Sequence, residues 1–463
     1  MTGEGRAQEI VERGLAAAGG LPCAVIVEDR YTVNVRWALT GLTTNGATRG
    51  RTVTAIVAAP VPGGLAVATL SRGGVGVEDV AELVGQVRVV AAGGSAAEDA
   101  AELMDGGVSP DWDEPAVETG PSALAPVTDG LAQVLARSRA QGREAFGFAL
   151  HEVSTTWLGT SAGTRRRHVQ PRATAELNGK SHERSRSAWE GQARQDPADL
   201  DLPAMDAEVA ARLGWQGRRF EITPGRYDTV LPPTAVADLM IYLYWSADAR
   251  SAAEGRSVFS RPGGGTRVGD RLSPMPLRLA SDPGTPGLSA APHVLTAASS
   301  PFASVFDNGL ATTPQDWIAE GVLRALPNSR HTARLSGLPF TPTVDNLTLS
   351  APDGAGVPGA LVEQLDRGLL LTCLWYIREV DPTTLLLTGL TRDGVYLVDG
   401  GEVVGAVSNF RFNESPVDLL DRTRAVSASE ITYSREWGEY FTRTAMPGLL
   451  VDGFNMSTAS EAS

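Results

Sequence analysis

The sequence contains little cysteine and no long hydrophobic run. Its two cysteines, Cys23 and Cys373, lie in opposite halves of 463 residues, so a disulfide framework is excluded and a reducing compartment is favoured. The longest strongly apolar run, Leu369 to Ile377, is far shorter than the roughly 20 residues that a membrane-spanning helix needs. The first residues lead into a charged amphipathic segment without an apolar signal region. These features predict a soluble, cytoplasmic protein that does not enter a membrane.

Positive charge is also scarce. The chain has 54 acidic side chains against 40 Lys and Arg side chains, which gives a formal net charge of −14. General affinity for nucleic acid or for an anionic membrane needs a basic surface, so this balance argues against both partners. The hydrophobic share of 42% and the charged share of 20% are typical of a globular protein. The length of 463 residues exceeds one ordinary core and predicts two or three domains.

The first half alternates helix and strand patterns and predicts an N-terminal α+β domain over residues 1–218. Apolar spacing indicates helices at 8–18, 77–89 and 128–139. Runs rich in β-branched residues predict strands at 24–27, 31–37, 52–57 and 65–70. An acidic, proline-rich stretch at about 108–126 is expected to be a loop. Hairpins are predicted at about 150–190, with turns at Ser161 to Gly163 and at Asn178-Gly179, because an Asn-Gly pair suits two positive φ angles.

The second half, residues 219–463, predicts a β-rich domain of twisted sheets with flanking helices, so the expected fold class is α+β. A strand is predicted at Gly225 to Leu231, followed by a helix that contains Val236 and stops at Gly255. A short helix is expected at Trp317 to Leu326. The remaining C-terminal segments predict strands with tight turns, at Asp393-Gly394 and at Asp399 to Gly401.

The helix that contains Val236 is apolar nearly all round. One broad stripe is formed by Val236, Leu239, Met240, Leu243, Tyr244 and Ala247, and three further large side chains, Ile241, Tyr242 and Trp245, lie off it. A helix of this kind is either deeply buried in its own domain or covered by a partner, at a subunit interface or a cavity wall. Burial is favoured, and the interface stays open as the alternative.

The histidines have no spacing that indicates a metal site. His151 and His182 each precede a glutamate, but neither is followed one turn later by the second histidine that a zinc-peptidase helix needs. We therefore interpret both as ordinary histidines, with His182 on a hairpin strand. Cys373 lies in an apolar run, where a buried thiol is inert.

Two glycine-rich stretches and one basic patch also have simple structural interpretations. Ser71 to Gly76 lacks the Lys-Ser/Thr pair of a phosphate-binding loop, and Arg261 to Arg271 precedes no predicted helix, so both are expected to be ordinary loops. The patch from Arg165 to Arg194 contains eight basic and three acidic side chains. It could bind nucleic acid or an acidic peptide, but the solvated face of a hairpin is favoured. The role of its central part, Arg165 to Arg186, stays open.

The second half contains four longer blocks that follow one another in a fixed order. They read "GRYDTVLPPTAVADLMIYL", "EGRSVFS", "DPGTPG" and "TLLLTGLTRDGVYLVDGGEVVGAVSNFRFNESPVDLL". Together, from about residue 220 to the end, they resemble the TldD/PmbA family of peptidase-complex proteins. The block "TCLWYIREVDPTTLLLTGLTRDGVYLV" is most similar to the TldE, or PmbA-like, branch. The first half resembles the family more loosely, through its helix and strand order and the stretch "TLSRGGVGVEDVAELVGQV".

The resemblance implies that zinc belongs to a partner and not to this chain. In the TldD branch a His-Glu-x-x-x-His motif and a later cysteine hold zinc, and the glutamate activates water. Alignment on the segment Ser257 to Ser260 puts the two histidines at Met240 and Trp245 and the glutamate at Ile241, and no cysteine follows Cys373. We therefore expect no catalytic, metal-binding or cofactor-binding residue here. Met240, Ile241 and Trp245 are expected to be degenerate zinc-site positions that could form a cavity wall or an interface.

The expected function is that of a TldE-like, non-catalytic subunit in a heterodimeric zinc metallopeptidase that degrades unfolded peptides or trims precursor peptides. Its implied partners are a TldD-like catalytic subunit and an extended peptide, with neither nucleic acid nor membrane. One alternative is an autonomous enzyme in peptide natural-product maturation, for which Asp238, Asp248 or Glu254 should converge on a cleft. Another is a regulatory binding module, such as a partner of DNA topoisomerase.

Overall fold

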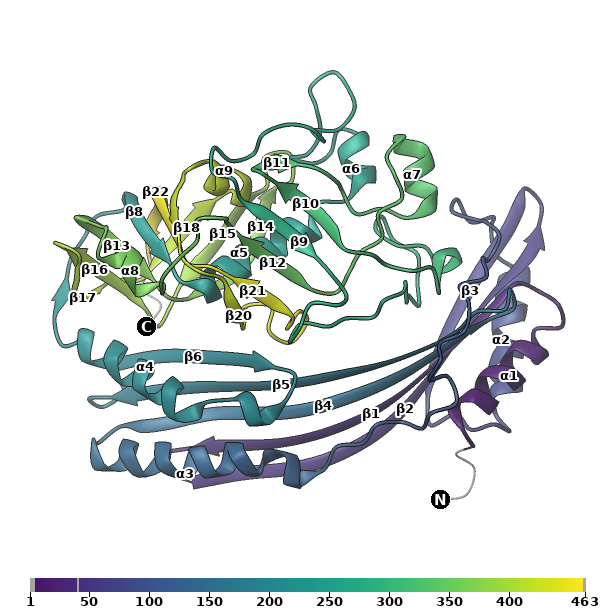
Figure 1. The fold of residues 1–463 in the computed structure, drawn as a ribbon, viewed down its shortest axis with the longest axis horizontal. Coiled ribbons are helices and arrows are strands. Elements are labelled where there is room, and N and C mark those ends of the chain that lie inside the picture. The colour runs from purple at the N-terminus through teal and green to yellow at the C-terminus, as the bar shows by residue number, and fades with distance from the viewer. Residues whose placement is uncertain (1–4, 40, 461–463) are drawn as a thin grey trace.

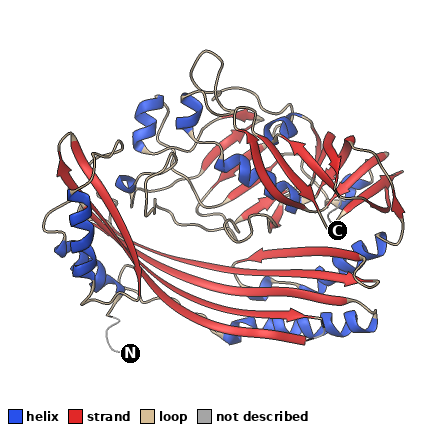
Figure 2. Ribbon diagram, turned by 180° about the vertical axis from the view of Figure 1, so that it is seen from behind, coloured by secondary structure: helices blue, strands red, loops and turns tan. Residues whose placement is uncertain are grey.

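The computed structural model describes residues 5–39 and 41–460. Within these residues the chain forms three β-sheets, one of six strands from its first half and two, of six and ten strands, from its second half. Helices flank the sheets, and the second half of the chain lies along the concave face of the long first sheet (Figures 1 and 2). This mixed architecture confirms the α+β class.

The first sheet is antiparallel throughout and has the strand order β3-β2-β1-β4-β5-β6. Its strands are β1 (Cys23–Ala38), β2 (Gly41–Val61), β3 (Gly64–Gly73), β4 (Glu144–Thr160), β5 (Arg165–Ser181) and β6 (Arg186–Arg194). Four helices pack on it, namely α1 (Ala7–Ala17), α2 (Val80–Ala92), α3 (Ala125–Ala140) and α4 (Leu202–Trp215). The first two helices cover one end of the sheet and the other two cover the opposite end (Figure 1).

Alternation along β1 assigns its side chains to the two faces of this sheet. Side chains in a strand point to opposite faces in turn, so every second residue shares one face. Val25 and Val33 lie in the two cores beneath the four helices. Ile26, on the other face, packs with Val305 and Phe306 from the second half of the chain. The long sheet is therefore buried on both faces near this contact, which joins the two halves.

The first half differs from its sequence prediction in two places. The runs 24–27 and 31–37 belong to one strand, because the residues between them stay paired with β2 and β4. The predicted turn at Asn178-Gly179 is wrong, because both residues lie inside β5. The chain turns instead at His182 to Arg184, three residues with positive φ, so His182 is not on a strand. Gly179 serves packing, because a Cβ there would lie 2.3 Å from Cγ1 of Val209 on α4.

The stretch 108–126 is largely irregular, apart from a bridge between Val108 and Arg165 and a 3-10 turn, η1 (Pro121–Leu124). The helix after it begins at Ala125, three residues earlier than predicted. A second 3-10 turn, η2 (Pro197–Asp199), leads into α4.

The second half builds the two remaining sheets around a central helix. The smaller sheet has the order β11-β10-β9-β12-β21-β20. Its strands are β9 (Arg278–Ser281), β10 (Gln315–Ala319), β11 (Val322–Leu323), β12 (Leu347–Ser350), β20 (Glu430–Thr432) and β21 (Thr444–Met446). The larger sheet runs β14-β15-β18-β22-β8-β13-β16-β17-β7, with β19 paired to β22. Its strands are β7 (Arg219–Phe220), β8 (Gly225–Leu231), β13 (Arg367–Leu371), β14 (Leu374–Asp381), β15 (Leu386–Thr391), β16 (Val395–Asp399), β17 (Glu402–Val407), β18 (Phe410–Glu414), β19 (Thr423–Val426) and β22 (Leu449–Ala459).

The central helix is α5 (Pro233–Trp245), and it shares one core with strands of both sheets. That core includes Leu369, Phe410 and Phe454 of the larger sheet and Leu279, Ile318 and Leu347 of the smaller one. The other elements of this half are short: α6 (Ala249–Ala253), η3 (Val305–Asp307), α7 (Arg330–Ser336), α8 (Gly359–Val362) and α9 (Pro416–Asp421). None of the helices in the described residues is long and apolar enough to cross a membrane.

Three expectations for the second half need correction. The helix that was predicted to extend to Gly255 ends at Trp245, and a separate helix, α6, begins after Asp248. The predicted helix from Trp317 to Leu326 is the β10–β11 hairpin, whose turn residues Glu320 and Gly321 both have positive φ. Asp393-Gly394 links β15 to β16, which belong to different parts of the larger sheet and do not pair. The predicted domain boundary near residue 218 falls between α4 and β7.

Candidate functional site

Helix α5 carries the three positions that the sequence resemblance singled out. Proline at the first helical position suits its start, because the ring fixes φ and the missing N–H would have no intrahelical partner. Met240 and Ile241 are fully buried in the core, while Trp245 is half-buried at the end of the helix. The stripe interpretation therefore holds for most of α5, and Trp245 with Tyr242 forms the part that reaches a pocket.

These side chains do not fit a zinc ion. Zinc in proteins is bound by thiolate, imidazole and carboxylate groups, and Met240, Ile241 and Trp245 supply none of them. The carboxylate of α5, Asp238, is committed elsewhere: its Oδ1 accepts from Ser434 Oγ at 2.5 Å and from the amide N of Glu436 at 2.9 Å. Burial raises the pKa of Asp238 to about 7, and its Oδ2 has no partner among the described atoms.

A C-terminal segment, residues 434–438, fills the space beside α5. The indole Nε1 of Trp437 donates to the main-chain oxygen of Asp238 at 2.9 Å. The carboxylate of Glu436 accepts the backbone N–H groups of Tyr376 and Ile377, at 2.9 and 3.0 Å, where β14 bulges away from β15. This arrangement is not predictable from local sequence patterns, because it joins segments that are about 60 and 200 residues apart in the chain. The only signal for it was the "REWGEYF" stretch in the region of the missing cysteine.

Arg435, in the same segment, places a cation beside the thiol of Cys373. Its Nη1 lies 2.9 Å from Cys373 Sγ and 3.1 Å from Asp393 Oδ2. Its guanidinium also lies over the rings of Trp189 and Trp375, at 4.8 and 4.7 Å from their centroids. Burial raises the pKa of the Cys373 thiol to about 12, which agrees with an inert cysteine. A positive group in this position repels a metal ion from the thiol and the carboxylate.

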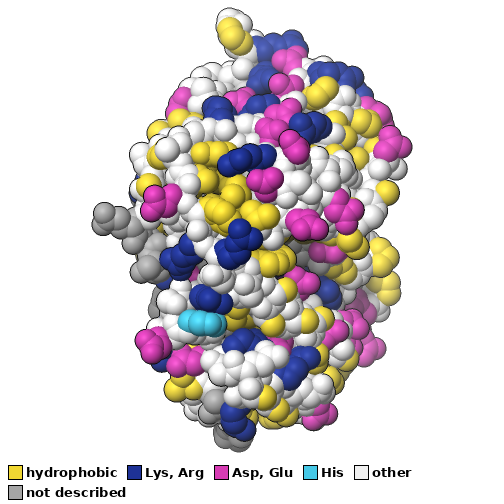
Figure 3. Space-filling model, turned by 90° about the vertical axis from the view of Figure 1, so that its left-hand side faces the viewer, with side chains coloured by type: hydrophobic (Ala, Val, Ile, Leu, Met, Phe, Trp, Pro, Cys, Tyr) yellow, Lys and Arg dark blue, Asp and Glu magenta, His cyan; other side chains and the backbone are white. Residues whose placement is uncertain are grey.

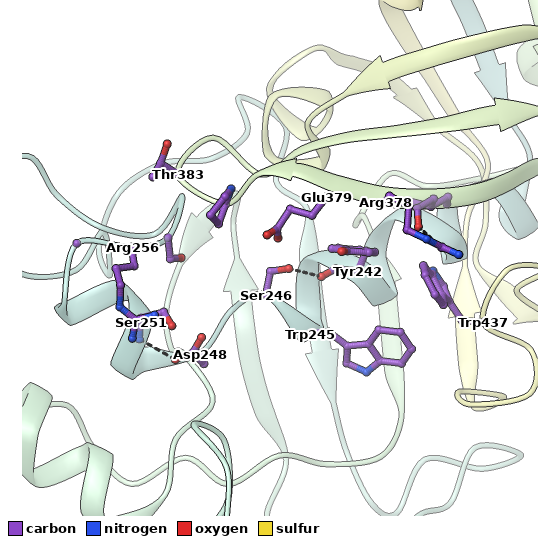
Figure 4. Close-up of a pocket in the computed structure, with 14 residues that line it drawn as sticks. Tyr242, Trp245, Ser246, Asp248, Ser251, Arg256, Arg378, Glu379, Thr383 and Trp437 are labelled. Carbon is purple, nitrogen blue, oxygen red and sulfur yellow. Dashed lines mark hydrogen bonds between the residues drawn. The ribbon is translucent and has the colours of Figure 1, made fainter.

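A pocket of about 830 Å³ opens between α5, α6 and the edge strand β14 (Figure 4). The C-terminal end of α5 supplies one wall, where the rings of Trp245 and Trp437 pack in a T-shaped arrangement and Tyr242 is tilted against the same indole. Its lining side chains come from four segments: Tyr242, Trp245, Ser246, Asp248, Ser251, Arg256, Ser257, Ile377, Arg378, Glu379, Pro382, Thr383 and Trp437. On its other side Trp245 also lines a second pocket, of about 430 Å³.

The carboxylates proposed for an autonomous enzyme do not act together. Asp238 is buried against Ser434 and Glu436, whereas Asp248 caps α6 by accepting from the amide N of Ser251 at 2.7 Å. Glu254 is bound by Arg250 and Arg256. Each carboxylate thus has its own structural partner.

The histidines form no metal site with α5 in the described residues, although His293 lines the second pocket with Tyr244 and Trp245. His151 lies on β4, where its Nδ1 is 2.7 Å from Thr119 Oγ1. His293 is buried, 6.5 Å from His168 between ring centroids, and burial together with His168 and Arg166 lowers its pKa to about 3. Among residues 5–39 and 41–460, no three His, Cys, Asp or Glu side chains gather as a metal site would need.

The two glycine-rich candidates, and one serine motif that was overlooked in the sequence, are structural. Gly159 to Gly163 matches the Gly-x-Ser-x-Gly pattern of a nucleophile elbow, but it forms the β4–β5 turn, where Ser161 Oγ accepts from Cys23 N at 3.0 Å. Arg261 to Arg271 is a loop with four glycines of positive φ. Ser71 to Gly76 runs from the end of β3 toward α2.

The basic patch is paired with acidic side chains. Arg165, Arg167, Arg172 and Arg184 form ion pairs with Glu12, Asp111, Glu152 and Glu144 respectively. Figure 3, which views the end of the molecule at the left of Figure 1, likewise shows basic and acidic side chains interspersed. These pairs compensate four of the eight basic side chains from Arg165 to Arg194.

A family model for the PmbA/TldA metallopeptidase C-terminal domain matches residues 224–458, which contain the pocket and α5. The chain belongs to the TldD/PmbA family. Its fold is similar to that of TldE from Thermococcus kodakarensis, with a TM-score of 0.77 and 16% identity over 97% of this chain and 99% of that one. It is also similar to proposed DNA gyrase modulators from Thermotoga maritima (TM-score 0.74, 16% identity, 97% and 99% covered) and Bacteroides thetaiotaomicron (0.75, 12%, 97% and 98%). No curated protein matches the chain.

These comparisons extend the family's fold to the first half of the chain. The matched family model begins at residue 224, but the structural similarity covers nearly the whole of each protein. The long curved sheet and its four helices are therefore part of the TldD/PmbA architecture.

Proposed function

We propose that this chain is the non-catalytic, TldE-like subunit of a cytoplasmic zinc peptidase whose zinc is held by a TldD-like partner. The observation that carries the proposal is the chemistry of α5. Positions that hold the zinc ligands and the base in the TldD branch are Met240, Trp245 and Ile241, and the two aliphatic side chains are fully buried. A fold shared with a TldE protein along nearly the whole chain supports the same assignment.

The pocket suits a subunit that holds peptide for its partner. The strand β14 lies at the edge of the larger sheet, and no strand within the described residues pairs with its outer side. Beyond the part that Glu436 occupies, the stretch from Arg378 to Asp381 runs along the pocket. An extended peptide can add to such an edge through its backbone, which tolerates many sequences and excludes folded substrates. The TldE-like chain would thereby complete a chamber for unfolded peptide.

Hydrolysis by the separate and combined chains tests this function. The chain alone, supplied with zinc, should cleave no unfolded peptide. A mixture with a TldD-like chain should cleave it, and size-exclusion mass measurement should show one copy of each. Restoration of cleavage by zinc after chelation of the mixture is the control. Zinc-dependent cleavage by the chain alone, abolished by a chelator, would contradict the proposal.

A second candidate is a regulatory module that binds a DNA topoisomerase. It is favoured by the description of two similar structures as proposed gyrase modulators. The net charge of −14 allows binding to the enzyme but argues against direct binding to DNA. Recovery of a gyrase and no TldD-like chain in a pull-down from cells that contain both would favour this candidate over the first.

A further inference from the structure

The pocket beside Trp245 contains two carboxylates without an ion pair. Glu379, on β14, has no basic partner among the described side chains, and in Figure 4 its carboxylate points toward Tyr242 and Ser246. Asp248, on the opposite wall, is almost fully buried and makes one backbone hydrogen bond, to Ser251. Burial removes most of the hydration of Asp248 and so destabilises its unpaired carboxylate, whereas the side chain of Glu379 is exposed.

The two arginines of the pocket are already neutralised. Arg378 Nη1 lies 3.2 Å from Glu436 Oε1. Arg256 pairs with Glu254. The charge available to a guest is therefore the negative charge of Glu379 and Asp248, although the pocket contains as many basic as acidic side chains.

The aromatic wall of the pocket also favours a positively charged ligand. The ring centroids of Trp245 and Trp437 are 5.2 Å apart, with planes inclined by 69°, and those of Tyr242 and Trp437 are 5.6 Å apart. Faces of tryptophan and tyrosine rings attract ammonium and guanidinium groups, and they also pack against the alkyl stem of lysine or arginine. An acidic guest would gain nothing from these rings and would be repelled by Glu379.

We propose that this pocket binds a basic side chain, lysine or arginine, of an extended peptide whose backbone lies along β14. The alkyl stem would pack on Trp245, Tyr242 and Trp437, and the cationic head would lie between Glu379 and Asp248. The inference rests on the proposed function for its peptide ligand and adds a charge preference to it. The raised pKa of Glu379, caused by burial and then by Asp381, agrees with a carboxylate that lacks a cation.

Binding of two matched peptides to the full chain tests the preference. One is a fluorescently labelled heptapeptide of Gly, Thr and Val with a central lysine. The other carries norleucine there, which keeps the alkyl stem and removes the charge. At low ionic strength, fluorescence anisotropy should give a Kd roughly tenfold lower for the lysine peptide, since an ion pair and a cation–π contact each contribute a few-fold. Glu379→Gln should reduce that ratio to about threefold or less.

The matched control is Glu402→Gln, because Glu402 is an exposed glutamate on β17, outside the pocket. It should leave the ratio unchanged. Equal affinity for the two peptides, no binding of either, or an equal effect of the two glutamine variants would overturn the inference. Cleavage of both peptides at one rate by the mixture with a TldD-like chain would preserve the proposed function while the charge preference fails. Preferential binding of the lysine peptide, without any cleavage by the mixture, would preserve the charge preference while the proposed function fails.

Discussion

Replacement of Asp238 by asparagine should remove a large pH dependence from the stability of the protein. The carboxyl group is fully buried under the C-terminal segment, and burial raises its pKa to about 7. Its pKa in the unfolded chain is about 4. The folded protein therefore holds this proton more tightly than the unfolded chain does. The contribution of Asp238 to stability is therefore greatest at acidic pH and falls as the pH rises from about 4 to about 7, because ionisation is easier after unfolding.

The magnitude follows from the two pKa values. Between pH 5 and pH 8, Asp238 should reduce the free energy of unfolding by roughly 2.5 kcal/mol. Asparagine keeps the oxygen that accepts from Ser434 Oγ and from the N–H of Glu436, and it puts a neutral NH2 group where Oδ2 has no partner. The variant should therefore retain the fold, and its free energy of unfolding should lack the decrease that Asp238 causes between pH 5 and pH 8.

The assay is denaturant unfolding of the wild type and Asp238→Asn at pH 5, 6, 7 and 8, followed by tryptophan fluorescence. The stability of the variant relative to the wild type should rise with pH by roughly 2.5 kcal/mol. Asp353→Asn, which removes an exposed carboxyl in a loop, is the control and should follow the wild-type profile. A difference between wild type and Asp238→Asn that is the same at all four pH values would refute the reasoning.

Three further predictions concern other buried groups. Burial lowers the pKa of His293 to about 3, so this group reduces the stability of the protein as the pH falls below about 6.5. In denaturant unfolding at pH 4, His293→Gln should retain roughly 2–3 kcal/mol of the free energy of unfolding that the wild type loses. An equal loss of stability in the variant and the wild type would show that the imidazole is not responsible. Gly179→Ala should lower the Tm by several degrees, because its Cβ would meet Val209 Cγ1 at 2.3 Å. An unchanged Tm would show that α4 does not pack this closely against β5. Burial raises the pKa of Cys23 and Cys373 to about 12, so a thiol reagent should modify neither cysteine in the native protein and both after unfolding. Stoichiometric labelling of the native protein would show that the thiols are not protected.

The apolar helix was predictable because its signal is local. A stripe at helical spacing after two prolines marks α5, and the same stripe indicates burial, which the fully buried Leu239 and Met240 bear out. The break after Trp245 was not predictable from that stripe, because Asp248 can equally continue a helix or cap a new one. Its role as the cap of α6 depends on the surroundings of the chain there.

Errors arose where distant packing outweighs a local signal. Asn178-Gly179 is a strong turn pattern, yet the close approach of α4 requires glycine in a strand, and the turn moves to His182. The run from Trp317 to Leu326 has apolar residues that suit a helix or a hairpin, and pairing with β9 decides for the hairpin. The pocket could not be predicted, because Trp245 and Trp437 are far apart in the chain and each is an ordinary aromatic residue by itself.

The position of Arg435 has a mechanical consequence. Its guanidinium lies between an indole of the first sheet, that of Trp189 on β6, and an indole of the larger sheet, that of Trp375 on β14. A hinge motion between the two halves would withdraw this cation from the ring of Trp189 and break a largely buried cation–π contact. Trp375 and Asp393 belong to the same half as Arg435 and would move with it. Such a motion is costly, so the two halves should move as one rigid body. A subunit that joins this surface therefore meets a shape set in advance and has little ordering entropy to overcome.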